Sequence, residues 1–142
     1  MHSGNTIDHP ELGRLEYNTK LKDYEAQWIG KEGPIKYSIA ADANNLEDEL
    51  AFAAEIFRSI DQIISDSKAY ACYKMLDDAN EWRLENELPI TEESFQDRLT
   101  KPILTFFGDR TFDLNYTTDM FGDHYVLVYN RNGEFYDAYF EG

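Results

Sequence analysis

Hydrophobic side chains recur every three or four residues between residues 46 and 82. The clearest run is Leu46, Leu50, Ala53, Phe57, Ile60 and Ile64. This spacing places them on one stripe of a helix, and the stripe needs an apolar surface to cover it. A single helix of that length would be unusual, so we predict two consecutive helices with a break between Ser59 and Ser67. Asn45 is the expected N-cap.

The segments on both sides of this region alternate between apolar and polar residues, which is typical of half-buried strands. The predicted strands cover residues 12–17, 24–29, 35–40, 101–107, 111–116, 124–130 and 134–139. The dipeptide Asn132-Gly133 predicts a tight hairpin between the last two. Residues 91–94 predict the start of a short helix that ends near Leu99.

Together these elements predict an α+β fold. We expect an antiparallel sheet of about seven strands in the order βββ-αα(α)-ββββ, with two main helices packed on one face. Residues 12–142 are expected to form a single domain. Residues 1–11 are expected to be a flexible N-terminal arm, because they are polar and His9-Pro10 favours an extended backbone.

The net charge of the chain limits the kinds of molecule that it could bind. The chain has 13 Lys and Arg against 28 Asp and Glu, a net charge of -15. Such a field argues against nucleic acid and membrane surfaces and would speed association with a basic protein. Solubility alone is the other explanation of the acidity. No apolar run approaches the ~18 residues of a membrane span. Cys72, the only cysteine, permits no internal disulfide, so we expect a cytoplasmic protein.

His124 is a weak candidate for a catalytic residue. Asp119 and Asp123 lie close to it in sequence, and an Asp–His pair can orient a general base. However, no nucleophile motif of the type Gly-x-Ser-x-Gly accompanies it. A structural histidine is therefore favoured, and a small hydrolase that uses His124 with a nearby aspartate is the alternative.

Four aspartates lie near the ends of successive predicted strands: Asp109, Asp113, Asp119 and Asp123. Their spacing matches no EF-hand loop, and the three histidines show no His-x-x-x-His arrangement. We therefore interpret them as solvated loop acids, and we expect neither a metal nor a cofactor.

Aromatic residues make up 15% of the chain and are frequent in the C-terminal strands. Because alternate residues of a strand point to opposite faces, Tyr125 and Tyr129 lie opposite His124 and Val128. One face would cover the helices, and the other would expose an aromatic patch. Aromatic residues rimmed by acids suit a protein partner, although tyrosine is also an ordinary half-buried strand residue.

Several short landmarks follow in order along the chain: His9-Pro10-Glu11-Leu12-Gly13, Trp28-Ile29-Gly30, Ala79-Asn80-Glu81-Trp82, Ile90-Thr91-Glu92-Glu93-Ser94-Phe95 and Gly122-Asp123-His124. Together they resemble a family of bacterial proteins known as a domain of unknown function, over roughly residues 9 to 142. In that family a histidine tends to follow an aromatic-Gly pair directly, whereas Asp123 intervenes here. In type, a small acidic bacterial protein is similar to the immunity proteins that neutralise toxins.

We therefore expect a non-enzymatic protein-binding module, such as a toxin-neutralising immunity protein, with a basic protein as its partner. The residues expected to bind that partner are Asp109, Asp119, Asp123 and Tyr125. A small hydrolase and a structural homodimer are the alternative hypotheses.

Overall fold

The computed structural model describes residues 6–42, 45–120, 122 and 124–141. Within these residues eight strands form one sheet, in the same order as along the chain. The strands are β1 (Thr6–His9), β2 (Gly13–Asn18), β3 (Asp23–Gly30), β4 (Gly33–Ala40), β5 (Thr100–Gly108), β6 (Thr111–Thr118), β7 (His124–Arg131) and β8 (Glu134–Glu141). The helices are α1 (Leu46–Arg58), α2 (Ile60–Trp82) and α3 (Glu92–Asp97). The prediction of an α+β fold is confirmed.

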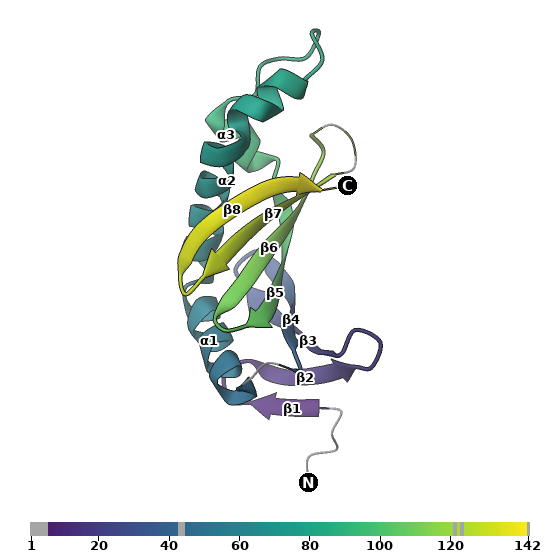
Figure 1. Ribbon diagram of the computed structural model, residues 1–142, viewed down its shortest axis with the longest axis vertical. Helices are drawn as coiled ribbons and strands as arrows, with labels where there is room; N and C mark the ends of the chain where they lie inside the picture. The colour runs from purple at the N-terminus through teal and green to yellow at the C-terminus, as the bar shows by residue number, and fades with distance from the viewer. Residues whose placement is uncertain (1–5, 43–44, 121, 123, 142) are drawn as a thin grey trace.

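The sheet is mixed, which corrects the prediction of a wholly antiparallel one. Strands β4 and β5 are parallel, with Tyr37 opposite Leu104 and Ile39 opposite Phe106, whereas the other neighbouring strands are antiparallel. The chain passes through the helices between these two strands, and that long crossover brings β5 back in the direction of β4. Figure 1 shows α1 and α2 running along one side of the sheet.

The N-terminal segment belongs to the sheet, so the prediction of a flexible arm is wrong from residue 6 onward. Strand β1 pairs with β2 and adds an eighth strand to the expected seven. The ring Nδ1 of His9 accepts hydrogen bonds from the backbone N–H groups of Glu11 and Leu12, both at 3.1 Å. The carboxylate of Glu11 binds Arg58 of α1 through two hydrogen bonds of 2.6 and 2.7 Å. These polar contacts fix a polar segment that has few apolar residues to bury. Residues 1–5 lie outside the described part.

The helical region breaks at Ser59, the N-terminal limit of the predicted interval. Asn45 caps α1 as predicted, because its side chain accepts a hydrogen bond from the Asp48 N–H at 3.1 Å. Ser67 stays inside α2 and is buried. Its hydroxyl is 2.5 Å from the Tyr116 hydroxyl on β6, so burial leaves neither group unpaired.

The hydrophobic core lies between the helices and the face of the sheet that they cover. Phe57 of α1 stacks on Trp28 at 5.0 Å between ring centroids and packs against Phe106. Farther along the sheet, Tyr70 of α2 stacks on Phe135 at 5.9 Å. We call this side the covered face. It buries the apolar stripe that the sequence predicts.

The opposite side of the sheet is the open face. Side chains alternate along each strand, so the neighbours of covered-face residues point to this side. In the part of the chain that the structure describes, α1 and α2 contact the sheet through covered-face residues and leave the open face without a helix. The expectation that helices pack on one face is thus confirmed.

Candidate functional site

The open face divides into two halves of different chemistry. Over β2 to β4 most of its side chains are polar or charged, with the exposed Ile29 as an aliphatic exception. The polar and charged residues are Arg14, Glu16, Asp23, Glu25, Gln27, Lys36 and Ser38. Over β5 to β8 many are aromatic or aliphatic, and they include Ile103, Phe107, Tyr125, Leu127, Tyr129, Tyr136 and Tyr139. We call these regions the polar half and the aromatic half. The predicted aromatic patch corresponds to the second.

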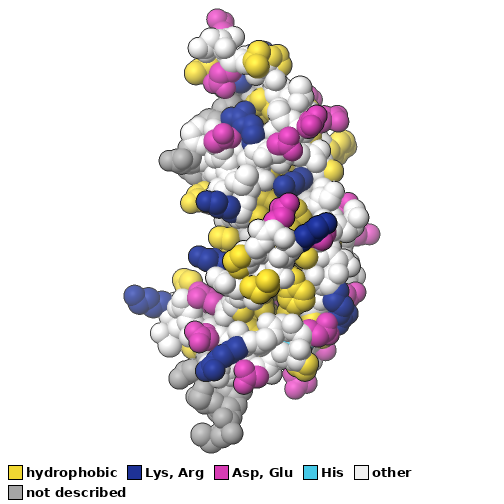
Figure 2. Space-filling model, turned by 180° about the vertical axis from the view of Figure 1, so that it is seen from behind, with side chains coloured by type: hydrophobic (Ala, Val, Ile, Leu, Met, Phe, Trp, Pro, Cys, Tyr) yellow, Lys and Arg dark blue, Asp and Glu magenta, His cyan; other side chains and the backbone are white. Residues whose placement is uncertain are grey.

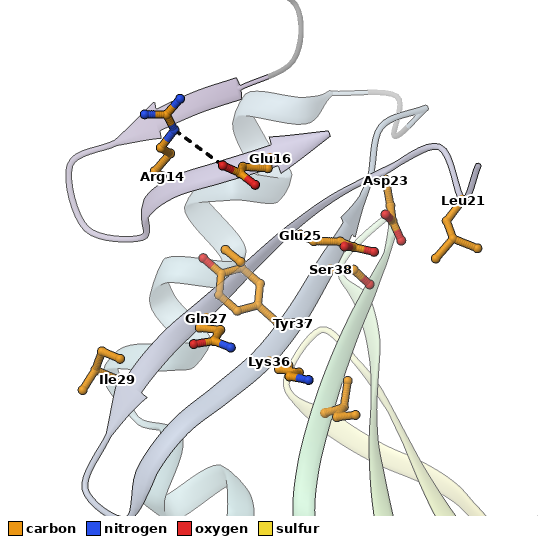
Figure 3. A pocket seen from close by; sticks show the side chains of 12 residues that line it. Arg14, Glu16, Leu21, Asp23, Glu25, Gln27, Ile29, Lys36, Tyr37 and Ser38 are labelled. Carbon is orange, nitrogen blue, oxygen red and sulfur yellow. Dashed lines mark ion pairs between the residues drawn. The ribbon is translucent and has the colours of Figure 1, made fainter. Parts of the chain in front are cut away.

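The polar half surrounds a hollow of about 810 Å³ (Figure 3). Two of its acids have partners within the chain, whereas the buried Oδ1 of Asp23 has none among the described residues. Arg14 lies 3.9 Å from Glu16, and the Asn18 amide donates a hydrogen bond of 2.9 Å to Glu25. Burial, and then the neighbouring Glu25 carboxylate, raise the pKa of Asp23. The result is a hollow lined by charges of both signs.

The aromatic half presents rings that are already held in place. Tyr125, Tyr136 and Tyr139 are 46%, 48% and 42% exposed. The Tyr129 and Tyr139 rings stack at 5.7 Å, and their hydroxyls are hydrogen-bonded at 2.8 Å. The Arg131 guanidinium lies 5.4 Å from the centroid of the Tyr136 ring. Rigid exposed rings are effective anchors for a protein partner, and one of them already accepts a guanidinium.

Asp113 is buried in the middle of the aromatic half. It lies on β6 between Phe112 and Leu114, which pack on the covered face, so its side chain points to the open face. It is 4% exposed. Burial, and then the Glu141 carboxylate, raise the pKa of Asp113 to about 7. The interpretation of this residue as a solvated loop acid is therefore wrong.

The sequence did contain a signal for that burial. Residues 111–116 alternate as a strand, and Asp113 occupies an outward position among residues that the same alternation assigns to the aromatic patch. Asp113 lies opposite Thr105 of β5 and Tyr129 of β7, and side chains on adjacent strands shield it from water even without a helix above it. Position within the strand, and not proximity to its end, decides the environment.

The structure separates the residues that the sequence grouped as a partner site. Asp109 lies in the turn between β5 and β6, at φ 53°. Asp119 follows the other end of β6, and an eight-residue strand spans roughly 25 Å. Tyr125 pairs with Thr117 near the Asp119 end and lies in the aromatic half. Asp123 is outside the described residues.

Asp119 also has a partner within the chain. The Arg98 Nε donates a hydrogen bond of 2.8 Å to the Asp119 carboxylate, whose side chain is 80% exposed. Asp119 is therefore not a free acid at the rim of the aromatic half. Its charge is largely matched before any partner approaches.

His124 begins β7, opposite Thr118, and lies on the same side of the strand as Val126. Its Nδ1 is buried and has no hydrogen-bond partner among the described residues. The Asp119 carboxylate binds Arg98 instead, so the general-base pair of His124 with Asp119 is not formed. Within the described ranges, no group of three or more His, Cys, Asp or Glu side chains could hold a metal ion.

The model of a family described as "Uncharacterized protein conserved in bacteria" (DUF2262) matches residues 9–139. The chain belongs to this family. The resemblance to a bacterial domain of unknown function is thereby confirmed. No curated protein and no solved structure is significantly similar to this DUF2262 member. None of the helices in its described residues is long and apolar enough to span a membrane.

The landmarks that point to DUF2262 have structural roles in this chain. Trp28 packs on Phe57 in the core. The Asn80 side chain donates to the Ile90 carbonyl at 2.9 Å and accepts from the Ile90 N–H at 2.8 Å, which fixes the connection from α2 to α3. Thr91 then caps α3. The contacts of Trp28, Asn80 and Thr91 thus stabilise the fold.

Proposed function

We propose that the protein is a non-enzymatic protein-binding module that docks a basic protein on its aromatic half. The most concrete form of this proposal is a toxin-neutralising immunity protein of bacteria. The observation that carries it is the aromatic half itself, where exposed rings gather on a sheet face that no helix of the described chain covers.

The composition of the aromatic half supports a protein partner. Its exposed apolar side chains are Ile103, Phe107, Tyr125, Tyr136 and Tyr139. Exposed apolar side chains that gather on one face are typical of interaction sites, and tyrosine is enriched at the centre of protein interfaces. The acids Asp137 and Glu141 lie at exposed positions of β8 and would form part of a polar rim.

The charge supports a basic partner. The net charge is -15, and the Arg131 guanidinium lies over the exposed Tyr136 ring. Figure 2 shows acidic side chains spread along the length of the molecule, with hydrophobic side chains exposed between charged ones. Such a field accelerates encounter with a basic protein and disfavours acidic competitors.

A capture experiment with matched variants tests the proposal. The tagged chain would be compared with a double variant, Tyr125→Ala with Tyr139→Ala, in extracts of its native cells at low and moderate salt. Tyr73→Ala is the control, because Tyr73 is 84% exposed on α2, away from the aromatic half. We expect the chain and the control to capture one basic protein, with less captured as salt rises. The double variant should lose that protein.

Two outcomes would overturn the proposal. Equal capture by the double variant would place the partner elsewhere. Recovery of only a second copy of the chain, with dimerisation lost in the double variant, would make the aromatic half a homodimer interface. Sedimentation of the purified chain at several concentrations separates this second outcome from the first.

A further inference from the structure

A second hollow lies where the parallel strands β4 and β5 part from each other. Among the described residues the two strands pair from Tyr37 and Leu104 onward, so the first four residues of each are not paired with the other strand. Each of these segments contains a proline, Pro34 or Pro102, which has no backbone N–H to donate to a neighbouring strand. Both segments line a hollow of about 680 Å³. We call it the β4–β5 hollow.

The β4–β5 hollow gathers positive charge in an acidic chain. Four of the seven lysines of the sequence line it, and they are Lys31, Lys36, Lys68 and Lys101. The acids that line it are Glu32, Asp61 and Asp97, which leaves an excess of one positive charge, against a net charge of -15 for the whole chain. In the described part of the chain, none of these lysines forms an ion pair. Their ammonium groups are therefore available to an anion.

The remaining walls of the hollow include apolar side chains. Ile35 of β4 and Ile64 of α2 are partly buried and pack against the hydrophobic core. Lys68 also comes from α2, and its Nζ lies 5.8 Å from the centroid of the Tyr116 ring. The helix thus forms one side of the hollow, and the two parted strands form the others. A volume of this size, with apolar walls and a few charged groups, is typical of small-molecule sites.

The chemistry of the lining matches the three parts of a nucleotide. A lysine ammonium is a compact charge with three donors, which suits a phosphate group. The carboxylates of Asp61 and Asp97 can accept hydrogen bonds from sugar hydroxyls, and the apolar side chains can cover a flat base. A sugar phosphate would leave the apolar wall without a ligand. A nucleic acid would extend beyond the lysines to the acidic remainder of the surface and be repelled there.

We propose that the β4–β5 hollow binds a mononucleotide. Its phosphate lies among the lysines, and its base lies against Ile35, Ile64 and Pro102. This inference does not rest on the proposed function, because no partner protein takes part in it.

The test uses small probes and the complete chain. AMP and UMP would each be titrated into isotope-labelled protein, and amide resonances would be followed by NMR. We expect saturable shifts at residues 31–36, 64–68 and 99–103 with at least one of them. Adenosine and uridine lack the phosphate, and inorganic phosphate lacks the base, so each should bind at least about tenfold more weakly than the corresponding nucleotide. No saturable shift at these residues with either nucleotide, or equal binding of the nucleosides, would overturn the inference.

Variants locate the phosphate. Lys31→Gln with Lys68→Gln removes two charges from the hollow and should weaken binding of the tighter nucleotide about tenfold or more. The matched control is Lys20→Gln with Lys74→Gln, which removes two charges from exposed positions that do not line the hollow. Its affinity should stay within about twofold of the original chain, because exposed distant charges are screened.

A second pair of substitutions guards against a folding defect in the first. Lys36→Gln with Lys101→Asn should also weaken binding, and asparagine tolerates the φ of 52° at residue 101. Affinity equal to that of the control in both double variants would overturn the inference. Lysines that only protect an open strand edge would give a different result, in which no nucleotide binds and the double variants self-associate. That result would also overturn it.

Discussion

The polar half and the aromatic half are built on neighbouring strands of one sheet, with the same alternation and different residues at the outward positions. In the polar half, Glu16 lies beside Arg14 and Glu25 accepts from Asn18. In the aromatic half, Asp113 is buried with an unpaired oxygen beneath exposed rings. Each half therefore holds a buried carboxylate oxygen without a described partner, that of Asp23 in the polar half and that of Asp113 in the aromatic half. The aromatic half differs in its exposed rings, which are the kind of surface on which we propose that a partner docks.

This difference teaches that total charge is a poor guide to where a partner binds. Acids are abundant in both halves, yet the exposed rings are concentrated in one. Burial also raises the pKa of the Asp113 carboxyl to about 7, so this group is largely neutral below that pH and adds less to the negative field than an exposed acid does. The predictions below test this contrast from the largest expected effect to the smallest.

The largest effect should separate the covered face from the aromatic half. Phe106 is fully buried against Phe57 and Phe112, whereas the adjacent Phe107 is 48% exposed on the open face. Phe106→Ala should lower the free energy of unfolding by about 3 to 5 kcal/mol, and Phe107→Ala by less than about 1 kcal/mol. Urea unfolding measures both. Similar losses of unfolding free energy in the two variants would mean that the exposed ring of Phe107 contributes to the stability of the fold and is not available to a partner.

The next effect concerns pH and Asp113, whose pKa is raised to about 7 in the folded chain. The unfolded value is about 4, so between these values the folded state binds more protons and its stability falls as pH rises. From pH 5 to pH 8 this residue should remove roughly 2 to 3 kcal/mol. Asp113→Asn should abolish that part of the decline, measured by urea unfolding at both pH values.

The control for the pH experiment is Asp137→Asn, because Asp137 is an exposed acid of the same half. It should keep the wild-type decline of stability with pH. An Asp113→Asn variant whose decline matches wild type would show that Asp113 is ionised in the folded chain at pH 5, against the environment described above.

Charge reversal in the two halves should have unequal effects on association. Asp137→Lys with Glu141→Lys reverses exposed acids of the aromatic half, and Glu16→Lys with Glu25→Lys does the same in the polar half. At low salt the first pair should slow association with the captured basic protein by about three- to tenfold, and more than the second. Stopped-flow rates over a range of salt test this. Equal slowing would mean that only net charge matters.

The smallest effect is expected at Asp119, which the sequence placed in the partner site. Its carboxylate binds Arg98, at a position beyond the end of β6. Asp119→Asn should change the free energy of unfolding by less than about 1 kcal/mol, because exposed ion pairs contribute little. It should also leave the association rate nearly unchanged. If Asp119→Asn slowed association as much as Asp137→Lys with Glu141→Lys does, Asp119 would belong to the partner site after all.

The sequence predicts the elements whose signals are local. The apolar stripe of the helices, the Asn45 cap and the alternation of the strands depend on spacings of a few residues, and the Asn132-Gly133 turn, with both residues at positive φ, depends on two. These local features are present in the folded chain because tertiary packing stabilises them as well. The choice of which strand face meets the helices also follows from the same alternation.

The features that the sequence did not predict depend on distant contacts. Strand β1 has little apolar character and is held by pairing with β2 and by the Glu11–Arg58 ion pair. The parallel pairing of β4 with β5 joins segments that lie on either side of three helices. The burial of Asp113 depends on side chains from adjacent strands. The two pairings leave no periodic signal within one segment, and the alternation of residues 111–116 indicates the outward position of Asp113 but not the neighbours that bury it.

The most direct test of the docking surface is tyrosine labelling, read by mass spectrometry, with and without the captured basic protein. Tyr125, Tyr136 and Tyr139 report on the aromatic half, and Tyr73 on α2 is the internal control. We predict that the partner protects the first three tyrosines and leaves Tyr73 labelled as before. Equal labelling of Tyr125, Tyr136 and Tyr139 in the free and bound chain would contradict the account.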